Sequence, residues 1–232
     1  MIEKPKKTKK DILHTVAKGA VAAVPIAGGP AAELFEAVFA PPISKRRDAW
    51  VESLMEELEA LKERLEGLKI EALGSNEEFV TLMMQASQAA LRTHHQEKLE
   101  ALRNAVCNAA VMPSGDEDMR SMFITFVDTL TPWHLRILAF FQSPAEWGAR
   151  NQLSYPNWSM GGAATVLEHT FPALNGRRDL YDQIVKDLFA RGLMTTDSLH
   201  TTVTRQSMFA SRTTPMGGRF LEFISSPLET KS

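Results

Sequence analysis

Two amphipathic helical patterns follow one another between Ser44 and Met112, and they constrain the fold more than any other feature of the chain. In the first pattern, apolar residues recur at alternating steps of three and four, which is the spacing of a helix that buries one narrow stripe against another helix. This stripe consists of Val51, Leu54, Leu58, Leu61, Leu65 and Leu68. The rest of that helix is mostly Glu, Lys and Arg, so we expect it to face water.

A turn signal at Gly74-Ser75 separates the two patterns and predicts an antiparallel helical hairpin. Ser75 is expected to cap the second helix, with Glu78 completing a capping box. The inward face of this helix is rich in alanine and comprises Phe79, Leu82, Met83, Ala86 and Ala90, then Leu99, Leu102, Val106 and Ala109 after the polar insert Thr93-His94-His95-Gln96. Since the first stripe covers only about two and a half heptads, we expect a further apolar helix or a second copy of the chain to stabilise the hairpin.

The N-terminal 40 residues differ from the hairpin in composition. Residues 1–10 are a basic arm with five lysines, and residues 11–40 predict two short apolar helices, hinged at Pro25–Pro30 and ended by Pro41-Pro42. The second helix has one apolar face, formed by Leu34, Phe35, Val38 and Phe39. We interpret this face as packing on the hairpin. The alternative is a latent element that inserts into an anionic membrane, as a toxin-like or phage-defence effector would need.

Composition excludes several classes of protein. With 44% apolar residues and a net charge of −2, the 232-residue chain is long enough for a sizeable core and has no overall attraction to nucleic acid or anionic membranes. Cys107, the single cysteine, follows the apolar stripe of the hairpin and is expected to be a small core residue. These features predict a cytoplasmic protein, peripheral to the membrane if residues 11–40 insert.

No recognisable set of catalytic residues appears in the sequence. There is no Cys/His spacing typical of a zinc site and no glycine-rich phosphate-binding loop. We therefore predict a non-enzymatic protein with no metal, no cofactor and no small-molecule substrate.

Shorter helices are predicted from residue 116 onward. Asp116 and the pairs Thr131-Pro132 and Thr214-Pro215 are start signals, and further helices are expected at Ala163–Phe171 and Arg178–Ala190. The inward face of the latter is expected to hold Leu180, Ile184, Leu188 and Phe189.

The segments between these helices predict a loop and two strands. Pro144–Gly162 reads as a long loop that Trp147, Tyr155 and Trp158 pin onto the domain. Leu193–Phe209 is rich in Thr, Val and Met without a helical stripe, and it predicts a β-hairpin around Thr195–Ser198.

Three helices precede this strand-like segment, and the third ends in Phe189-Ala190-Arg191-Gly192-Leu193. A closing helix then begins with the run Thr213-Thr214-Pro215-Met216-Gly217-Gly218-Arg219-Phe220-Leu221. This order resembles a winged-helix domain over roughly residues 119–226. The resemblance implies an α+β fold in which a small β-hairpin forms the wing. Many winged helices bind DNA with the third helix in the major groove, and many others only contact proteins.

The charges of the candidate third helix disfavour DNA. Residues 177–187 hold three Asp against two Arg and one Lys, and negative charge on this helix would repel phosphate. If DNA were bound, the candidate contacts would be Arg177, Arg178, Lys186, Arg205, Arg212 and Arg219.

We therefore predict a mainly α protein whose apolar helices and long hairpin occupy residues 11–112. A winged-helix-like domain occupies residues 116–226, and residues 227–232 are a tail. The predicted role is an interaction or regulatory protein that assembles through the hairpin and docks a protein partner through the winged-helix-like domain. A membrane-active effector and a DNA-binding regulator are the alternatives.

Overall fold

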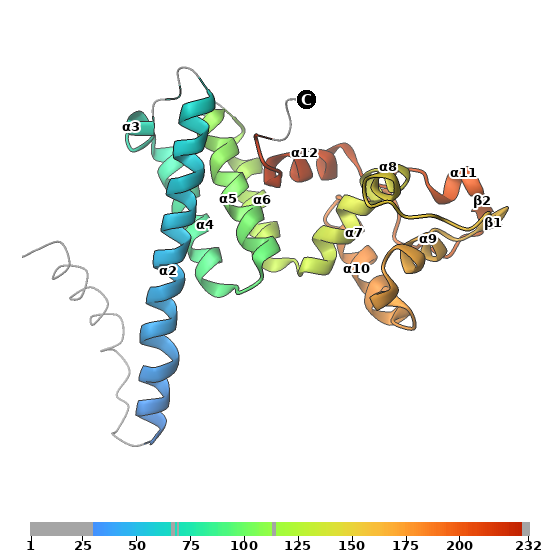
Figure 1. The fold of residues 1–232 in the computed structure, drawn as a ribbon, viewed down its shortest axis with the longest axis horizontal. Coiled ribbons are helices and arrows are strands. Elements are labelled where there is room, and N and C mark those ends of the chain that lie inside the picture. The colour runs from blue at the N-terminus through green and yellow to red at the C-terminus, as the bar shows by residue number, and fades with distance from the viewer. Residues whose placement is uncertain (1–29, 66–67, 69, 113–114, 229–232) are drawn as a thin grey trace, which may run out of the picture. The chain divides into compact units, whose positions relative to one another are not determined.

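The structure is a computed structural model that describes residues 30–65, 68, 70–112 and 115–228, with side chains from residue 44 onward. Within these residues the chain is mainly α, with eleven α-helices, one 3₁₀ turn and one small two-stranded antiparallel sheet (Figure 1). The chain divides into two compact units, Met1–Arg46 and Arg47–Ser232. The basic arm, the first apolar helix and most of the predicted hinge lie outside the described residues. So do the side chains of Leu34, Phe35, Val38 and Phe39.

Helix α2 (Pro30–Arg64) begins where the sequence predicts, with a proline at its first position. The predicted end at Pro41-Pro42 is wrong, because α2 continues through both prolines. Each proline removes one backbone N–H donor from the helix, but its fixed φ of about −65° is compatible with helical backbone.

The C-terminal part of α2 forms the first arm of the predicted hairpin. It buries Leu54, Leu58 and Leu61 as expected, but Val51 is exposed and Trp50 is buried beside the stripe instead. The indole Nε1 of Trp50 donates to Ser87 Oγ at 3.0 Å. A long aromatic side chain one position away thus replaces the shorter valine as the inward residue at this end of the stripe.

The second arm of the hairpin is interrupted, contrary to prediction. After the short helix α3 (Ile70–Leu73), the chain forms α4 (Glu77–Arg92) and α5 (Gln96–Val111) as separate helices. The polar insert makes the break: Thr93 is extended, and its Oγ1 accepts a hydrogen bond from the His95 amide at 3.2 Å. The cap of α4 is also Asn76 rather than Ser75, since Asn76 Oδ1 accepts from the Phe79 amide at 3.1 Å.

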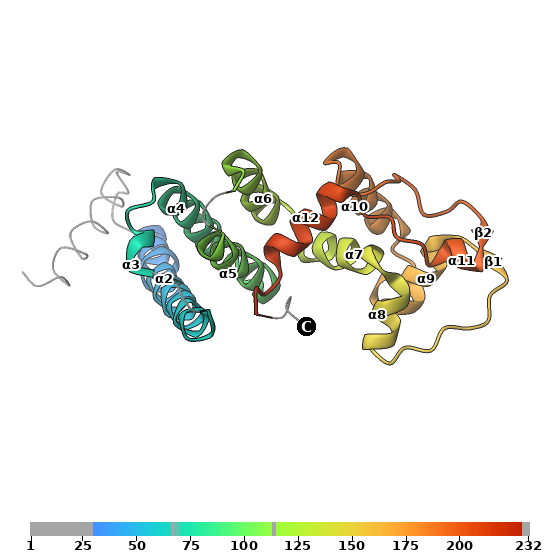
Figure 2. The same ribbon diagram turned by 90° about the horizontal axis from the view of Figure 1, so that it is seen from above.

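Helix α6 (Glu117–Thr129) packs against α4 and α5, and both ribbon views show the three helices side by side (Figure 2). Asp116 caps α6 as predicted, accepting from the Met119 amide at 2.9 Å. The last helix, α12 (Pro215–Ile224), contacts both α5 and α7 (Pro132–Gln142), so its contacts cross the boundary predicted at residues 112–116. A ring cluster of Phe123, Phe126, Phe220 and Phe223 fills the space between α6 and α12.

The remaining helices are α7 (Pro132–Gln142), α8 (Pro144–Arg150), α9 (Ala163–Thr170), the 3₁₀ turn η1 (Pro172–Leu174), α10 (Arg178–Ala190) and α11 (Arg205–Met208). Helix α8 occupies the first part of the predicted loop, because Pro144 suits a first helical position. In α10 Ile184 and Leu188 are buried as expected. Phe189 is 45% exposed, and Tyr181 and Val185 point inward instead.

The predicted β-hairpin at Leu193–Phe209 is not formed. The sheet instead pairs β1 (Met160–Gly161) with β2 (Val203–Thr204), two segments far apart in sequence. Met194 forms an isolated antiparallel bridge with Thr213, which leaves residues 195–202 as a loop. The pattern of β-branched residues indicated extended backbone, but it could not indicate which segments pair to form the sheet.

Candidate docking surface

Three of the six predicted DNA contacts bind other groups of the fold, and the other three are exposed cations. Arg205 and Arg212 bind backbone carbonyl groups of their own domain: Arg205 donates to Pro156 O at 2.8 Å, and Arg212 donates to Ala210 O at 2.7 Å and Ser207 O at 2.8 Å. Arg178 pairs with Asp182 at 3.3 Å. The other three, Arg177, Lys186 and Arg219, are exposed on α10, its N-cap or α12.

Two of the three α10 aspartates have partners within the fold. Asp182 accepts from His200 Nε2 at 2.6 Å, which ties the loop 195–202 to α10. Asp187 accepts from Gln183 Nε2 at 2.7 Å and from His134 Nε2 at 3.4 Å. The acids that disfavour phosphate therefore also hold neighbouring segments onto this helix.

Cys107 is a buried thiol, as the sequence predicts. Burial raises its pKa to about 12, so the thiol remains protonated at neutral pH and is a poor nucleophile. Among the residues that the structure describes, no group of three or more His, Cys, Asp or Glu side chains is placed to hold a metal ion.

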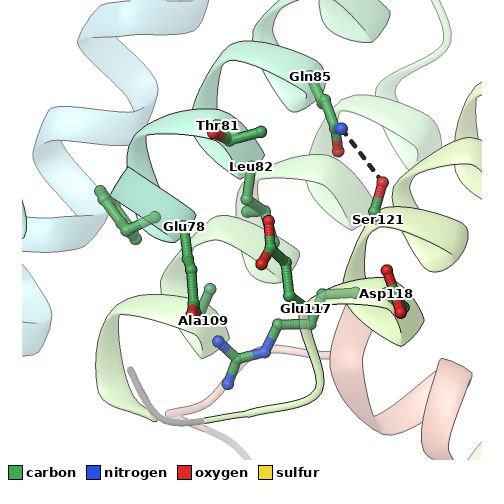
Figure 3. A pocket seen from close by; sticks show the side chains of 10 residues that line it. Glu78, Thr81, Leu82, Gln85, Ala109, Glu117, Asp118 and Ser121 are labelled. Carbon is green, nitrogen blue, oxygen red and sulfur yellow. Dashed lines mark hydrogen bonds between the residues drawn. The ribbon is translucent and has the colours of Figure 1, made fainter. Parts of the chain in front are cut away.

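A small hollow lies between α4 and the start of α6 (Figure 3). Phe79, Leu82 and Ala109 contribute apolar lining, and Glu78 and Glu117 are among the polar side chains around it. Its volume of about 90 Å³ is well below the 300 to 1,000 Å³ or so of pockets that enclose drug-sized ligands. A hollow of this size suits a few water molecules or one side chain.

The most distinctive surface lies on the loop after α8. Tyr155 and Trp158 are half-buried there, and they meet His169 of α9 and Phe209, which follows α11. The Tyr155 ring centroid lies 4.9 Å from that of Phe209 and 5.4 Å from that of His169, while Trp158 lies 5.4 Å from His169 at a steep angle. We call Tyr155, Trp158, His169 and Phe209, together with the exposed Met160, the aromatic loop surface.

Polar contacts hold the aromatic loop surface from beneath. The hydroxyl of Thr170 donates to Val166 O, so the Tyr155 hydroxyl is the donor in its 2.8 Å bond to Thr170 Oγ1. His169 Nε2 donates to Ser154 O at 3.0 Å. Arg205 binds the loop carbonyl of Pro156 and lies 5.7 Å from the Phe209 ring centroid, a cation–π distance.

The backbone of this loop is specified by its packing. Gln152 has a φ of 55°, a conformation that costs free energy for a residue with a side chain and persists only where tertiary contacts impose it. Gly148 packs against the Tyr155 ring, and a Cβ at that position would overlap the ring. The aromatic side chains therefore stand on a preformed loop.

The sequence indicated part of this surface. It predicted that Trp147, Tyr155 and Trp158 pin the loop. Trp147 instead lies in α8 and packs that helix against Phe140 and Phe171. It did not identify His169 and Phe209, which come from other elements. The available signal was the aromatic and Arg content of residues 205–209, which has no periodicity to attach it to the loop.

Comparisons with protein-family models, curated proteins and solved structures give no match to this chain. In the part of the chain that the structure describes, no helix combines the length and apolar character needed to cross a membrane.

Proposed function

We propose that this chain is a non-enzymatic interaction or regulatory protein that docks a protein partner through its C-terminal helical region and assembles through its N-terminal helical hairpin. The observation that supports docking is the aromatic loop surface. Trp, Tyr and Arg are the residues most enriched at the energetic centres of protein interfaces, because they combine a large apolar area with a polar group. Tyr155, Trp158 and Arg205 lie together on this surface.

The expected partner is a protein segment with apolar or aromatic side chains. Several polar groups of the surface are already engaged, since Tyr155 donates to Thr170, His169 donates to Ser154 O and Arg205 binds Pro156 O. Met160, 65% exposed, adds an adaptable apolar side chain at the edge. The binding free energy would come mainly from burial of apolar area, and the preformed loop would limit the entropy lost on binding.

The two alternatives remain hypotheses. DNA binding would rely mainly on Arg177, Lys186 and Arg219, because Arg178, Arg205 and Arg212 have partners in the fold. Membrane insertion would rely on residues 11–40, whose side chains lie outside the described residues.

The docking proposal is tested by comparing the proteins that purify with the intact chain and with its variants from the native cell. Met160→Ser and Trp158→Ser should each deplete the same partner, by about tenfold or more for Trp158→Ser, as expected for a central aromatic residue. Met112→Ser is the control, because Met112 is 54% exposed at the end of α5. A partner set that is equal in all four samples would contradict the proposal.

A further inference from the structure

The hairpin presents an apolar face to solvent on the side of α2 and α4. Met55 of α2 is 61% exposed and Met84 of α4 is 58% exposed. Val51 and Val80 precede them by one helical turn and are exposed as well. We call these four residues the methionine face. Half of the large exposed apolar side chains of the described residues belong to it.

Helices α2 and α4 run in opposite directions (Figure 1), so residues far apart in sequence come to similar levels along the two helices. The bond from Trp50 Nε1 to Ser87 Oγ fixes their relative level. At 1.5 Å per residue, Met55 lies about 7.5 Å along the axes from this bond, Met84 about 4.5 Å and Val80 about 10.5 Å, all toward the same end. The four residues therefore fall within about 9 Å of one another along the helix axes, near the place where α2 meets α4.

We propose that the methionine face binds the methionine face of a second copy of this chain, with the two α2 helices antiparallel about Met55. This inference rests on the proposed assembly through the hairpin, and it names the surface and the partner. A face that binds its own copy lies on a two-fold axis, and residues equally distant from the axis then meet. Met55 would meet Met55 of the other copy.

The charges on α2 favour the antiparallel orientation. With Met55 on the axis, Asp48 comes opposite Lys62 of the other copy, because both lie seven residues from Met55 and share its side of α2. A parallel pair would instead bring each of these charges against its own counterpart. In the single chain Arg47 pairs with Asp48 at 3.0 Å and Lys62 with Glu71 at 2.8 Å, all with exposed side chains. Exposed pairs of this kind exchange at little cost, so they select orientation more than they add affinity.

The size of the face sets the expected affinity. Stable complexes bury about 800 Å² per partner, and one helical hairpin face with four apolar residues lies below that standard. We therefore expect a reversible dimer that forms with a Kd on the order of 10 μM rather than an obligate one.

Sedimentation velocity of the full chain between about 1 and 200 μM tests the proposal, a range chosen to bracket the expected Kd. The mass should rise from that of one chain, 25.8 kDa, toward that of two. Met55→Glu places two carboxylates on the axis and should weaken the dimer at least about 100-fold. Met112→Glu, with similar exposure outside the face, should leave it unchanged.

Orientation is tested by charge reversal and by cross-linking. Asp48→Lys should weaken the dimer, and adding Lys62→Asp in the same chain should restore it. Met55→Cys should form a disulfide-linked dimer under mild oxidation, whereas Met112→Cys should not, and the native Cys107 is buried.

A chain that stays at the mass of one copy over the whole range, or a dimer that Met55→Glu leaves intact, would overturn the proposal. If the chain is a monomer and Met55→Glu instead removes a different protein from the purified set, the face belongs to that protein and the proposal is also wrong. Neither result affects the partner that Trp158→Ser depletes, so failure here is distinguishable from failure of the docking proposal.

Discussion

Asn108 is a buried polar side chain on α5 that forms hydrogen bonds with the C-terminal end of α12. Its Nδ2 group donates to Phe223 O and to Ser225 O, both at 2.8 Å. Asn104, one turn earlier, donates to Ile224 O at 3.0 Å. The last carbonyl groups of a helix have no partner within that helix, so these two asparagines satisfy part of the C-terminal end of α12.

Replacing Asn108 with alanine should lower the free energy of unfolding by about 2 kcal/mol, because buried carbonyl groups would lose their donor. Asn151→Ala is the matched control, since Asn151 donates to one carbonyl group, Trp147 O, at an exposed site. That change should cost less than about 0.5 kcal/mol. Urea unfolding of both variants measures the difference, and equal losses would show that the α5–α12 contact does not depend on Asn108.

His134 is a second buried polar residue, and both nitrogens of its ring form hydrogen bonds. The Thr131 amide donates to His134 Nδ1 at 3.2 Å, so the ring proton is on Nε2, which donates to Asp187. Burial lowers the pKa of His134 below its ordinary value of 6.5, and this effect outweighs the opposite influence of Asp187. The folded protein therefore keeps His134 neutral at pH values where the unfolded chain takes up a proton.

This difference predicts how stability depends on pH. A depressed folded pKa means that the contribution is present above pH 6.5 and is lost as the pH falls from 6.5 through the folded pKa. The wild-type chain should lose more unfolding free energy between pH 7.5 and pH 5 than His134→Gln, which cannot be protonated. Chemical denaturation at the two pH values gives the comparison. Identical losses in the two chains would contradict the assignment.

At the scale of elements, the sequence predicted the helices that have local start signals. The Thr131-Pro132 and Thr214-Pro215 pairs both begin helices, and Asp116 caps α6. It did not predict the break at Thr93–His95 or the pairing of β1 with β2. Those features depend on partners distant in sequence. Before the break, Arg92 binds the Asp128 carboxylate at 2.6 Å, and after it Lys98 binds Asp128 O at 2.8 Å.

The same distinction holds for the candidate surface. Tyr155 and Trp158 were singled out because they lie in one aromatic loop, whereas Phe209 joins them only in three dimensions. The arginines around the predicted wing were identified by charge. The hydrogen bonds of Arg205 and Arg212 to their own backbone could not be predicted from composition.

Adjacent glycines in α12 provide a test at this scale. A Cβ on Gly217 would overlap Leu193 O and lie 2.7 Å from Thr213 Cγ2, whereas a Cβ on Gly218 would meet nothing within 4 Å. Gly217→Ala should therefore destabilise the fold by about 2 kcal/mol or more, through displacement of α12 from Leu193. Gly218→Ala should stabilise it by about 0.5 to 1 kcal/mol, because alanine favours helix. Thermal unfolding would contradict the described packing if both changes had the same sign.

At the scale of the whole molecule, DNA binding is the alternative most open to direct test. Because acids accompany the cations of α10, we expect no measurable binding of duplex DNA at about 50 mM salt. Fluorescence anisotropy of a labelled duplex measures this. Binding that weakens steeply toward about 200 mM salt, and that Lys186→Glu removes, would favour the DNA-binding alternative.

The membrane alternative predicts that the intact chain, but not one lacking residues 1–40, floats with anionic liposomes. We expect both to remain in the soluble fraction, as for an N-terminal apolar face that packs against protein. Flotation of the intact chain alone would show that residues 1–40 bind membranes.

The central claim, docking through the aromatic loop surface, is tested most directly by photo-cross-linking in the native cell. A benzoylphenylalanine is placed either at Met160, on the surface, or at Phe189, which is 45% exposed on α10. The proposal predicts a protein adduct from position 160 that Trp158→Ser abolishes, and none from position 189. Adducts from position 189 only, to protein or to nucleic acid, would contradict it and place the binding site on α10.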